Sequence, residues 1–402
     1  MARAARHDCG QAAVLGLLAA AAGACAAVRN PPGGPPDFDP PELVSVVPDS
    51  GSIQDNFSGR VEFRFDEVVS ERSAGGLERL IEVSPRHERL SISWRRNTIA
   101  VKPRDGWIQN TVYHVTLLKG ATDLSNNVSD SSTTVTFSTG GAIPATVLSG
   151  TAVDWEQSRM AVGALVEAIH LPDSLTYTGR TDSVGNFRIT ALPRGDYLLL
   201  ATIDGNGNRR RDRREAFDSV LVSLDSSATA TLWTFAHDTT GPRLRAAAQI
   251  DSVTTRLTFN QMLAPAEPAR GDMRILLLPD SQPVLVDSVM SKEAYDSLVA
   301  ARRALAVTVA DSLAAPDSVA VDSIAATVEE TEDPQLAILS ERPKLSDSWY
   351  VVTIEPLLHE RRYVFVAIAS NIEGAVEESR TLLVTAERAE ERAEAAEPQD
   401  SL

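Results

Sequence analysis

The chain has 402 residues, with 38 basic and 55 acidic side chains and a formal net charge of −17. Its 43% of hydrophobic residues is enough for packed cores in about two to four domains. General nucleic-acid binding is excluded, because neutralising phosphates needs clustered Lys and Arg. The two cysteines, Cys9 and Cys25, both stand near the N-terminus, which excludes a disulfide scaffold and a cysteine-based zinc site in the body.

The first 24 residues have the pattern of an export signal. Arg3 and Arg6 precede an apolar run over residues 12–22, and small residues then lead to Cys25. This ending resembles the bacterial lipobox, in which a signal peptidase cuts before an acylated cysteine. The resemblance implies a lipoprotein signal peptide over residues 1–24 and lipidation of Cys25. Secretion after cleavage and a retained anchor are the alternatives, although the uncharged run is shorter than the ~20 residues of a spanning helix.

Residues 25–41 are rich in Pro and Gly and are expected to form an extended tether. An acyl chain such as palmitate on Cys25 would attach the chain to a membrane, and the acidic body would itself avoid anionic head groups. Ala26 stands where an Asp signals inner-membrane retention in many lipoproteins. The resemblance therefore implies the outer membrane of a bacterial cell envelope, facing either the periplasm or the cell surface.

From Glu42 onward, short segments alternate apolar and polar residues between turn residues, as is typical of β-sandwiches. One series of segments lies at residues 47–51, 61–67, 81–85, 110–113, 121–127 and 136–140. In that order and spacing they resemble the SbsA-type bacterial Ig-like domain of surface-layer proteins. The resemblance implies an Ig-like sandwich over residues 42–140 that carries no catalytic residues.

Residues 145–235 have a different pattern. Residues 149–153 begin a predicted strand that residues 164–169 continue, and a turn with Gly185 then precedes Phe187 and a Pro-x-Gly-x-Tyr segment ending at Tyr197. This order resembles the carboxypeptidase regulatory-like domain, a transthyretin-like sandwich without peptidase activity. Gly185 and Gly195 suit turns with positive φ, and Phe187 and Tyr197 are expected in the core.

After a hinge at residues 238–242, residues 242–386 are predicted to be a degenerate second copy of the first domain. Residues 256–260 and 363–367 resemble the strands at 61–65 and 113–117. An insert with repeated Asp-Ser pairs interrupts this copy over about residues 287–345. Within it, the spacing of apolar residues predicts a helix over 291–309, and the rest is expected to be a mobile excursion.

The helix rests on one stripe of apolar residues. These are Ala294, Leu298, Ala301 and Leu305. The charged tail, residues 387–402, is expected to be a solvated helix or disordered and is assigned no function. The predicted fold class is thus all-β: three tandem β-sandwiches, Ig-like and transthyretin-like, with a partly helical or disordered insert in the third.

The sharpest candidate site is the segment of residues 204–215. Oxygen-bearing side chains fall at positions 1, 3, 5, 9 and 12, the spacing of an EF-hand calcium loop. These residues are Asp204, Asn206, Asn208, Asp212 and Glu215. The sixth position, normally glycine, is Arg209, at a strain of ~1–2 kcal/mol for positive φ, and five arginines oppose a cation.

Similar loops recur in the transthyretin-like modules that this segment resembles. A structural calcium that stiffens the loop and an ordinary Gly/Asn hairpin tip are therefore both open. No cofactor is otherwise required.

None of the common enzyme motifs is complete in this sequence. His359 begins a zincin-like segment, but its second histidine is replaced by Tyr363. The chain has no Gly-x-Ser-x-Gly turn and no phosphate-binding Gly-Lys-Ser/Thr loop. Among five tryptophans, Trp94 and Trp233 fall in strand patterns, whereas Trp107 and Trp155 lie nearer turns and could stack on sugars.

The sequence therefore predicts a noncatalytic envelope lipoprotein that serves as a structural or adaptor module for a protein or glycan partner. The alternative is an accessory ligand-binding component, for carbohydrate or peptide, of an envelope processing system. Exposed aromatic residues on one sandwich face would favour the alternative.

Overall fold

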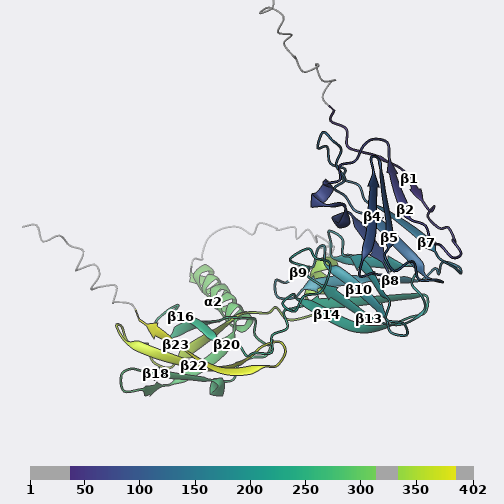
Figure 1. The fold of residues 1–402 in the computed structure, drawn as a ribbon. Helices are drawn as coiled ribbons and strands as arrows, with labels where there is room; N and C mark the ends of the chain where they lie inside the picture. Colours follow the sequence, from purple (N-terminus) through teal and green to yellow (C-terminus); the bar gives the residue numbers. More distant parts are fainter. Residues whose placement is uncertain (1–36, 314–333, 386–402) are drawn as a thin grey trace, which may run out of the picture.

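The computed structural model describes residues 37–313 and 334–385 (Figure 1). The predicted signal peptide, Cys25, most of the tether, the middle of the insert and the charged tail lie outside the described residues. The described strands form six sheets, two for each of three successive β-sandwiches. This confirms the predicted all-β fold class. None of the described helices is long and apolar enough to span a membrane.

The first sandwich contains seven strands and two short 3-10 helices. One sheet has the order β1 (Leu43–Val47), β2 (Val61–Phe65), β5 (Thr98–Pro103), β4 (Leu90–Arg95), and the other β3 (Ile81–Ser84), β6 (Val112–Leu117), β7 (Thr133–Ser138), with η1 (Ser73–Gly75) and η2 (Leu77–Arg79) before β3. Strand β2 explains the fold: Val61, Phe63 and Phe65 are buried, whereas Glu62 and Arg64 between them are exposed. A period of two thus places one face of the sheet on the core.

The second sandwich pairs two four-stranded sheets. One has the order β11 (Thr176–Arg180), β10 (Leu165–His170), β13 (Gly195–Thr202), β14 (Phe217–Leu224), and the other β12 (Asn186–Thr190), β8 (Val147–Asp154), β15 (Ser227–Thr234), with β9 (Arg159–Met160) on β8. Gly185 and Gly195 have positive φ, and Phe187 and Tyr197 are buried, as expected.

One prediction for this sandwich is wrong. Residues 149–153 and 164–169 do not continue one strand, because β8 and β10 belong to opposite sheets. The chain reverses after β8, where Ser158 has a φ of +48°, and β9 pairs back on β8 through Val153 and Met160. A second turn at Gly163, with a φ of +71°, then leads into β10. Alternation alone does not reveal this reversal, since it continues on both sides of the turn.

The third sandwich repeats the strand order of the first. One sheet has the order β16 (Leu244–Gln249), β17 (Thr254–Phe259), β21 (Ser348–Thr353), β20 (Val286–Ser291), and the other β19 (Gln282–Val284), β18 (Met273–Leu277), β22 (Arg362–Ser370), β23 (Val376–Val384), with η3 (Arg270–Asp272) before β18. Strands β16, β17, β21 and β20 correspond to β1, β2, β5 and β4, and β18, β22 and β23 to β3, β6 and β7. Strand β19 has no counterpart in the first sandwich.

The correspondence extends to single hydrogen bonds. The backbone N–H of Ile108 donates to the Tyr113 hydroxyl at 2.8 Å, and that of Leu358 donates to the Tyr363 hydroxyl at 2.8 Å. Asn110 and Glu360, in the turns between these partners, both have a φ of +53°. The third sandwich therefore shares its strand order and this hydrogen bond with the first.

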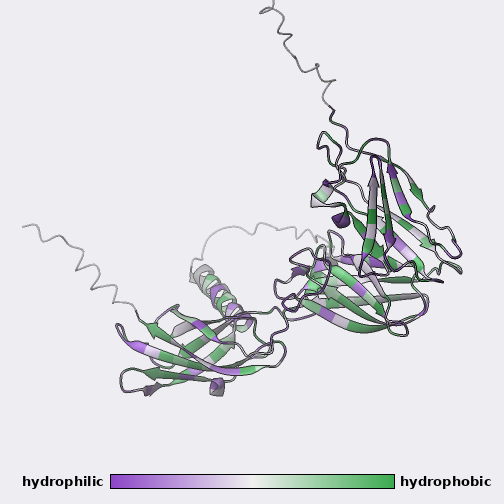
Figure 2. Cartoon of the chain, in the orientation of Figure 1, coloured by the Kyte–Doolittle hydropathy of each residue, from purple (hydrophilic) through white to green (hydrophobic). Residues whose placement is uncertain are grey.

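The insert replaces the turn between β20 and β21, which in the first sandwich is the tight β4–β5 hairpin. It begins after Ser291, because Asp287 and its neighbours belong to β20, so the predicted start at 287 is too early. The predicted helix is present as α2 (Lys292–Leu313), and a short helix α3 (Pro334–Leu339) follows. Tyr295 stacks on Tyr350 at 3.9 Å, but Leu305 is 67% exposed. Figure 2 shows hydrophilic and hydrophobic residues mixed along α2. In α2, Ala294, Tyr295 and Leu298 are partly buried, whereas residues 299–307 are exposed.

Candidate functional site

The first two sandwiches meet along the edges of two sheets. Strands β3 and β11 are each the outermost strand of their sheet. The N–H of Arg86 donates to the Thr176 carbonyl at 2.7 Å, and the N–H of Thr178 donates to Ser84 Oγ at 3.0 Å. An open strand edge invites pairing with other chains, so this contact covers both edges at once. We call this contact zone the seam.

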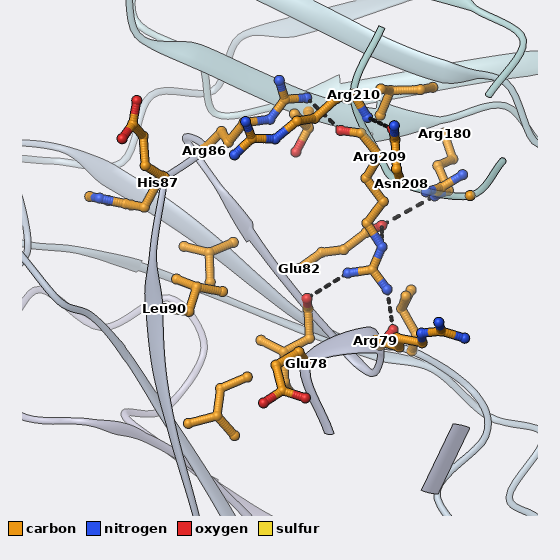
Figure 3. A pocket seen from close by; sticks show the side chains of 18 of the residues that line it. Glu78, Arg79, Glu82, Arg86, His87, Leu90, Arg180, Asn208, Arg209 and Arg210 are labelled. Atoms are coloured by element: carbon orange, nitrogen blue, oxygen red, sulfur yellow. Dashed lines mark hydrogen bonds and ion pairs between the residues drawn. The ribbon is translucent and has the colours of Figure 1, made fainter. Parts of the chain in front are cut away.

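A cavity of about 800 Å³ lies beside the seam (Figure 3). It falls within the usual size range of ligand sites, ~300–1,000 Å³. Both sandwiches contribute to its wall, and the charged members of the lining are Glu78, Arg79, Glu82, Arg86, Glu88, Arg180, Arg209 and Arg210. The concentration of arginine stands out in so acidic a chain, and the function of the cavity depends on whether these charges are free.

Arg86 of the first sandwich is held by Glu167 of the second. Their side chains approach to 2.5 Å, and the Glu167 side chain on β10 is only 8% exposed. Arg86 also donates to the Arg209 carbonyl at 3.1 Å. A carboxylate that is buried to this degree needs a charged partner, so Arg86 is committed to holding the seam.

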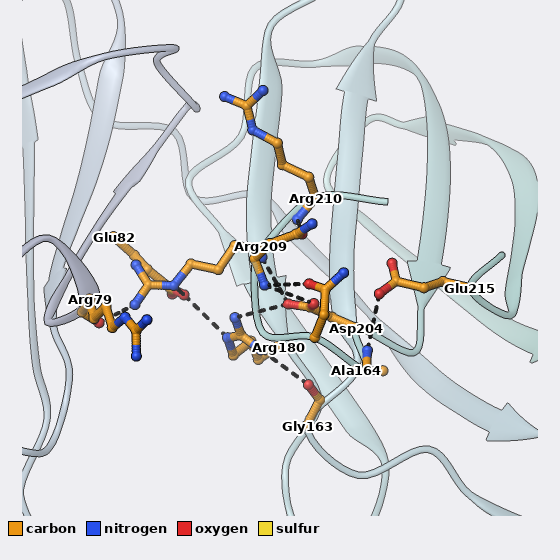
Figure 4. Close-up of polar contacts among 12 residues, drawn as sticks. Arg79, Glu82, Gly163, Ala164, Arg180, Asp204, Arg209, Arg210 and Glu215 are labelled. Carbon is orange, nitrogen blue, oxygen red and sulfur yellow. Dashed lines mark hydrogen bonds and ion pairs between the residues drawn. The ribbon is translucent and has the colours of Figure 1, made fainter. Parts of the chain in front are cut away.

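Arg209 reaches from the second sandwich into the first (Figure 4). Its guanidinium donates to the Ile81 carbonyl at 2.7 Å and to the Arg79 carbonyl, and it lies 3.3 Å from Glu82. Arg180 shares Glu82 at 3.2 Å. Burial lowers the pKa of Arg209, and Glu82 opposes that shift. Two guanidiniums thus converge on one carboxylate at the seam.

The lining offers little for covalent chemistry. It contains no serine, cysteine or lysine among the residues that the structure describes. His87 lies 3.1 Å from the Tyr113 hydroxyl, and burial lowers the pKa of its imidazole. Burial also raises the pKa of Tyr113 to about 12. The lining residues that the structure describes therefore place no serine, cysteine or lysine nucleophile beside a base.

The predicted calcium loop borders the same cavity. Arg209 has a φ of +62°, the conformation that the sixth position of such a loop needs. The carboxylate of Asp204, 1% exposed, accepts the N–H of Asn208 at 3.1 Å and that of Arg209 at 2.9 Å. The side-chain amides of Asn206 and Asn208 both donate to Asp212.

The last member of that loop closes it. Glu215 accepts the N–H of Gly205 at 3.1 Å and that of Asp212 at 2.9 Å. The five predicted ligands therefore lie in one loop held by hydrogen bonds, and the residue that departs from the calcium pattern, Arg209, is the one that crosses the seam. The calcium interpretation stays a prediction.

Sequence reasoning missed a cluster of carboxylates in the first sandwich. Oxygen atoms of Asp37, Glu67 and Asp123 lie within 4.8 Å of one another. Burial, and then the negative charges of Asp123 and Asp37, raise the pKa of Glu67. The corresponding residues of the third sandwich are Gln261 and Asn371, whose amides hydrogen-bond at 3.2 Å. Aligning the two copies would have exposed this difference.

The tryptophans do not form a sugar-binding platform. Trp107, Trp155, Trp233 and Trp349 are at most 7% exposed. Trp94 is half-buried and donates to the Val69 carbonyl at 2.8 Å. Among the Phe, Tyr and Trp side chains that the structure describes, only Phe38 is exposed. The expectation that Trp155, near a turn, could stack on sugars is therefore wrong: it lies at a contact between domains.

Comparison with known families identifies the first sandwich. Residues 37–139 match the bacterial Ig-like domain family. The match covers the first sandwich alone, and the described chain as a whole has a multi-domain, Ig-like β-sandwich fold. No curated protein matches the chain.

Solved structures show only distant likenesses. The chain is 12% identical to the L,D-transpeptidase from Mycobacterium smegmatis over 63% of this chain and 76% of that one, with a TM-score of 0.19. It is 15% identical to the N-terminal part of the bacterial S-layer protein SbsC over 47% of this chain and 44% of that one, with a TM-score of 0.18. It is 12% identical to a DUF3823 family protein from Bacteroides ovatus over 59% of this chain and 98% of that one, with a TM-score of 0.18. Values this low carry no conclusion about function.

Proposed function

We propose that this protein is an exported lipoprotein of the bacterial envelope, anchored in the outer membrane through acylated Cys25. Its three sandwiches would act as a noncatalytic structural or adaptor module for an envelope protein or glycan. The first sandwich would be of the SbsA type, and the second of the carboxypeptidase regulatory-like type. The match of residues 37–139 to a bacterial Ig-like family supports this proposal.

The observation that carries the noncatalytic part is the use of charge at the seam. Arg86, Arg180 and Arg209 enter the cavity wall, yet each is paired with a carboxylate, Glu167 or Glu82, that helps hold the two sandwiches together. Ion pairs that hold two sandwiches together in this way fix the position of one sandwich relative to the other. A fixed shape is what a spacer or adaptor needs to present its surfaces.

The carbohydrate version of the accessory-component alternative has less support. Protein–sugar contacts commonly use exposed aromatic faces, and the described surface offers only Phe38. The cavity beside the seam is the feature that would suit a ligand, but the pairing of three of its arginines leaves less charge for recognition.

The anchor is tested by replacing Cys25 with Ser in the full-length precursor and following its partition between membrane and soluble fractions. We expect the variant to leave the membrane fraction and to lose its acyl mass. Cys9→Ser is the matched control, because Cys9 lies within the predicted signal peptide and its loss should change nothing. Unchanged partition of Cys25→Ser would refute lipidation.

The adaptor role is tested by cross-linking the anchored protein in intact envelopes and purifying it. A stable protein partner would support the role of an adaptor for a protein. An enriched glycan would show instead that the module binds carbohydrate. Turnover of envelope polymers by the purified protein would overturn the noncatalytic assignment.

A further inference from the structure

Two arginines in the wall of the seam cavity keep N–H donors that the seam does not use. Arg86 makes both of its side-chain contacts, to Glu167 and to the Arg209 carbonyl, through Nη2. A guanidinium has five N–H donors, so those on Nε and Nη1 of Arg86 are not used by the described residues. The exposed side chain of Arg210 makes no ion pair or hydrogen bond within the described part of the chain.

These two arginines enter the cavity from neighbouring points. Arg86 donates to the carbonyl of Arg209, the residue directly before Arg210, and Figure 3 shows both side chains at the same end of the cavity. The N–H of Arg210 donates to Asn208 Oδ1 at 2.7 Å, which fixes the backbone from which this side chain extends. Guanidiniums held in this way suit a carboxylate, whose two oxygens accept N–H donors in pairs.

A free carboxylate lies elsewhere in the same wall. Glu78 is exposed and has no ion pair or hydrogen bond through its side chain to any other described residue. Figure 3 shows it at the opposite end of the cavity from Arg86 and Arg210. Nη1 of the neighbouring Arg79 lies 3.6 Å from the place where a Cβ on Gly75 would stand, so that guanidinium is turned toward η1. The Glu78 carboxylate is therefore available to an ammonium group.

The charges left over in the lining balance each other. Once the seam pairs are set aside, two arginines and two glutamates have no oppositely charged partner among the described residues. These are Arg79, Arg210, Glu78 and Glu88. A ligand that carries one sign of charge meets repulsion as well as attraction here, whereas a ligand with one charge of each sign can match both.

The wall between the two charged ends is aliphatic. Val83, Leu90, Ile92, Leu118 and Leu165 all contribute to it. Leu90 and Ile92 pack only partly against the core of the first sandwich, and Figure 3 shows Leu90 between the two ends of the cavity. Apolar side chains of a ligand would be removed from water against this wall.

We propose that the seam cavity binds a short peptide with free termini and aliphatic side chains. Its C-terminal carboxylate lies on Arg86 and Arg210, its N-terminal ammonium lies on Glu78, and its side chains lie along Leu90 and Ile92. The peptide is held without chemical change. This inference goes beyond the proposed structural role and does not depend on the lipid anchor.

Calorimetric titration of the purified full chain with leucyl-alanyl-leucine tests the proposal. The tripeptide should bind, because it has one charge of each sign and two large aliphatic side chains. Amidation of its C-terminus and acetylation of its N-terminus should each weaken binding by about tenfold, since each change removes one charge pair.

Two variants assign the ends of the peptide. Arg210→Gln should weaken binding of the free tripeptide by about tenfold, and amidation should then have little further effect, because the partner of the carboxylate is already gone. Glu78→Gln should make acetylation similarly ineffective. Both side chains are exposed and unpaired, so both variants should keep the melting temperature of the parent protein.

Arg194→Gln is the matched control, because Arg194 is a largely exposed arginine of the second sandwich outside the cavity lining. It should bind the tripeptide as the parent does. The proposal is overturned if leucyl-alanyl-leucine, trialanine and trivaline all fail to bind at millimolar concentration. It is also overturned if amidation weakens binding equally in the parent and in Arg210→Gln.

The same titration of the Cys25→Ser protein separates this proposal from the lipid anchor. Its affinity for leucyl-alanyl-leucine should equal that of the parent, because Cys25 contributes nothing to the cavity lining. Loss of membrane partition with unchanged affinity would support both proposals. Unchanged partition with unchanged affinity would refute the anchor alone, and absence of binding by both proteins would refute the peptide site alone.

Discussion

Glu67 and Asp123 of the first sandwich occupy the positions of Gln261 and Asn371 in the third. In the third sandwich the two amides donate and accept between themselves. In the first, Asp123 is satisfied by the N–H and amide of Asn127, and Glu67 is left among like charges. The same backbone therefore carries a neutral pair in one copy and a repulsive pair in the other.

Replacing Glu67 with Gln should remove a pH dependence of stability. Because the pKa of Glu67 is raised in the folded protein, the unfolded chain loses this proton first as pH rises above the ordinary value of 4.5. Stability then falls until pH exceeds the folded pKa. The Glu67→Gln variant should lack this fall in melting temperature as the pH rises above 4.5.

Glu71→Gln, at an exposed glutamate nearby, provides the comparison and should follow the parent protein. Superimposable pH profiles for the parent and Glu67→Gln would show that the carboxylate cluster does not affect folding.

The prediction of a calcium site is tested by the increase in the free energy of unfolding that calcium causes. Saturating calcium should raise the free energy of unfolding by about 2.7 kcal/mol at one hundred times the dissociation constant, seen as a higher melting temperature. Asp204→Asn should abolish this increment, although it also weakens two backbone hydrogen bonds without the ion. A melting temperature that calcium leaves unchanged would favour the plain hairpin tip.

Tyr113 and Tyr363 are the second residues of β6 and β22. Both are buried, and the hydroxyl of each accepts the backbone N–H of the residue five positions earlier. Tyr113→Phe and Tyr363→Phe each leave that N–H without its acceptor, at a cost of about 1–3 kcal/mol. Thermal unfolding of the two variants should show losses of similar size, because the two bonds are equivalent. Tyr113 also contacts His87, so a clearly smaller loss at Tyr113 would contradict the equivalence.

The sequence predicts a strand well where apolar and polar residues alternate and one face of the sheet is buried. It predicts poorly which sheet a strand joins, because that depends on contacts between residues far apart in the chain. Strand β2 follows from its period of two, and α2 from apolar spacing. The order of β8 and β10 was missed because a turn does not interrupt alternation. Asp287 was assigned to the insert because its Asp-Ser pair resembles those that follow.

The site was less predictable still. Asp204 and its partners were found because their spacing is local. Arg86 and Glu167, and Trp155 and Pro343, are brought together only by folding, and no spacing rule links residues so far apart. The hydrophobic pattern places Trp155 near a turn without saying that another domain covers it.

The first two sandwiches behave as one body if the seam is as strong as its contacts indicate. Arg86→Met removes the only charged partner of Glu167 among the described residues and leaves that carboxylate buried, at an expected cost of about 3–5 kcal/mol. The melting temperature should fall, and small-angle scattering should show looser packing of the two sandwiches.

A second change should restore much of that loss. Arg86→Met with Glu167→Gln leaves no unpaired charge and should regain stability. Arg194→Met is the control, because its pair with Asp225 is largely exposed and contributes little. If Arg86→Met proves as mild as Arg194→Met, the seam does not depend on this ion pair.

Strand β19 distinguishes the two related sandwiches in a way that affects the entire array. It covers the edge of β18, whereas the equivalent edge of β3 is covered by the second sandwich. The two related sandwiches are therefore not interchangeable modules: the edge of β3 depends on a neighbouring domain for its cover, whereas the edge of β18 is covered within its own sandwich. Removing the second sandwich would therefore leave the β3 edge of the first open to solvent, whereas β18 would keep the cover that β19 gives it.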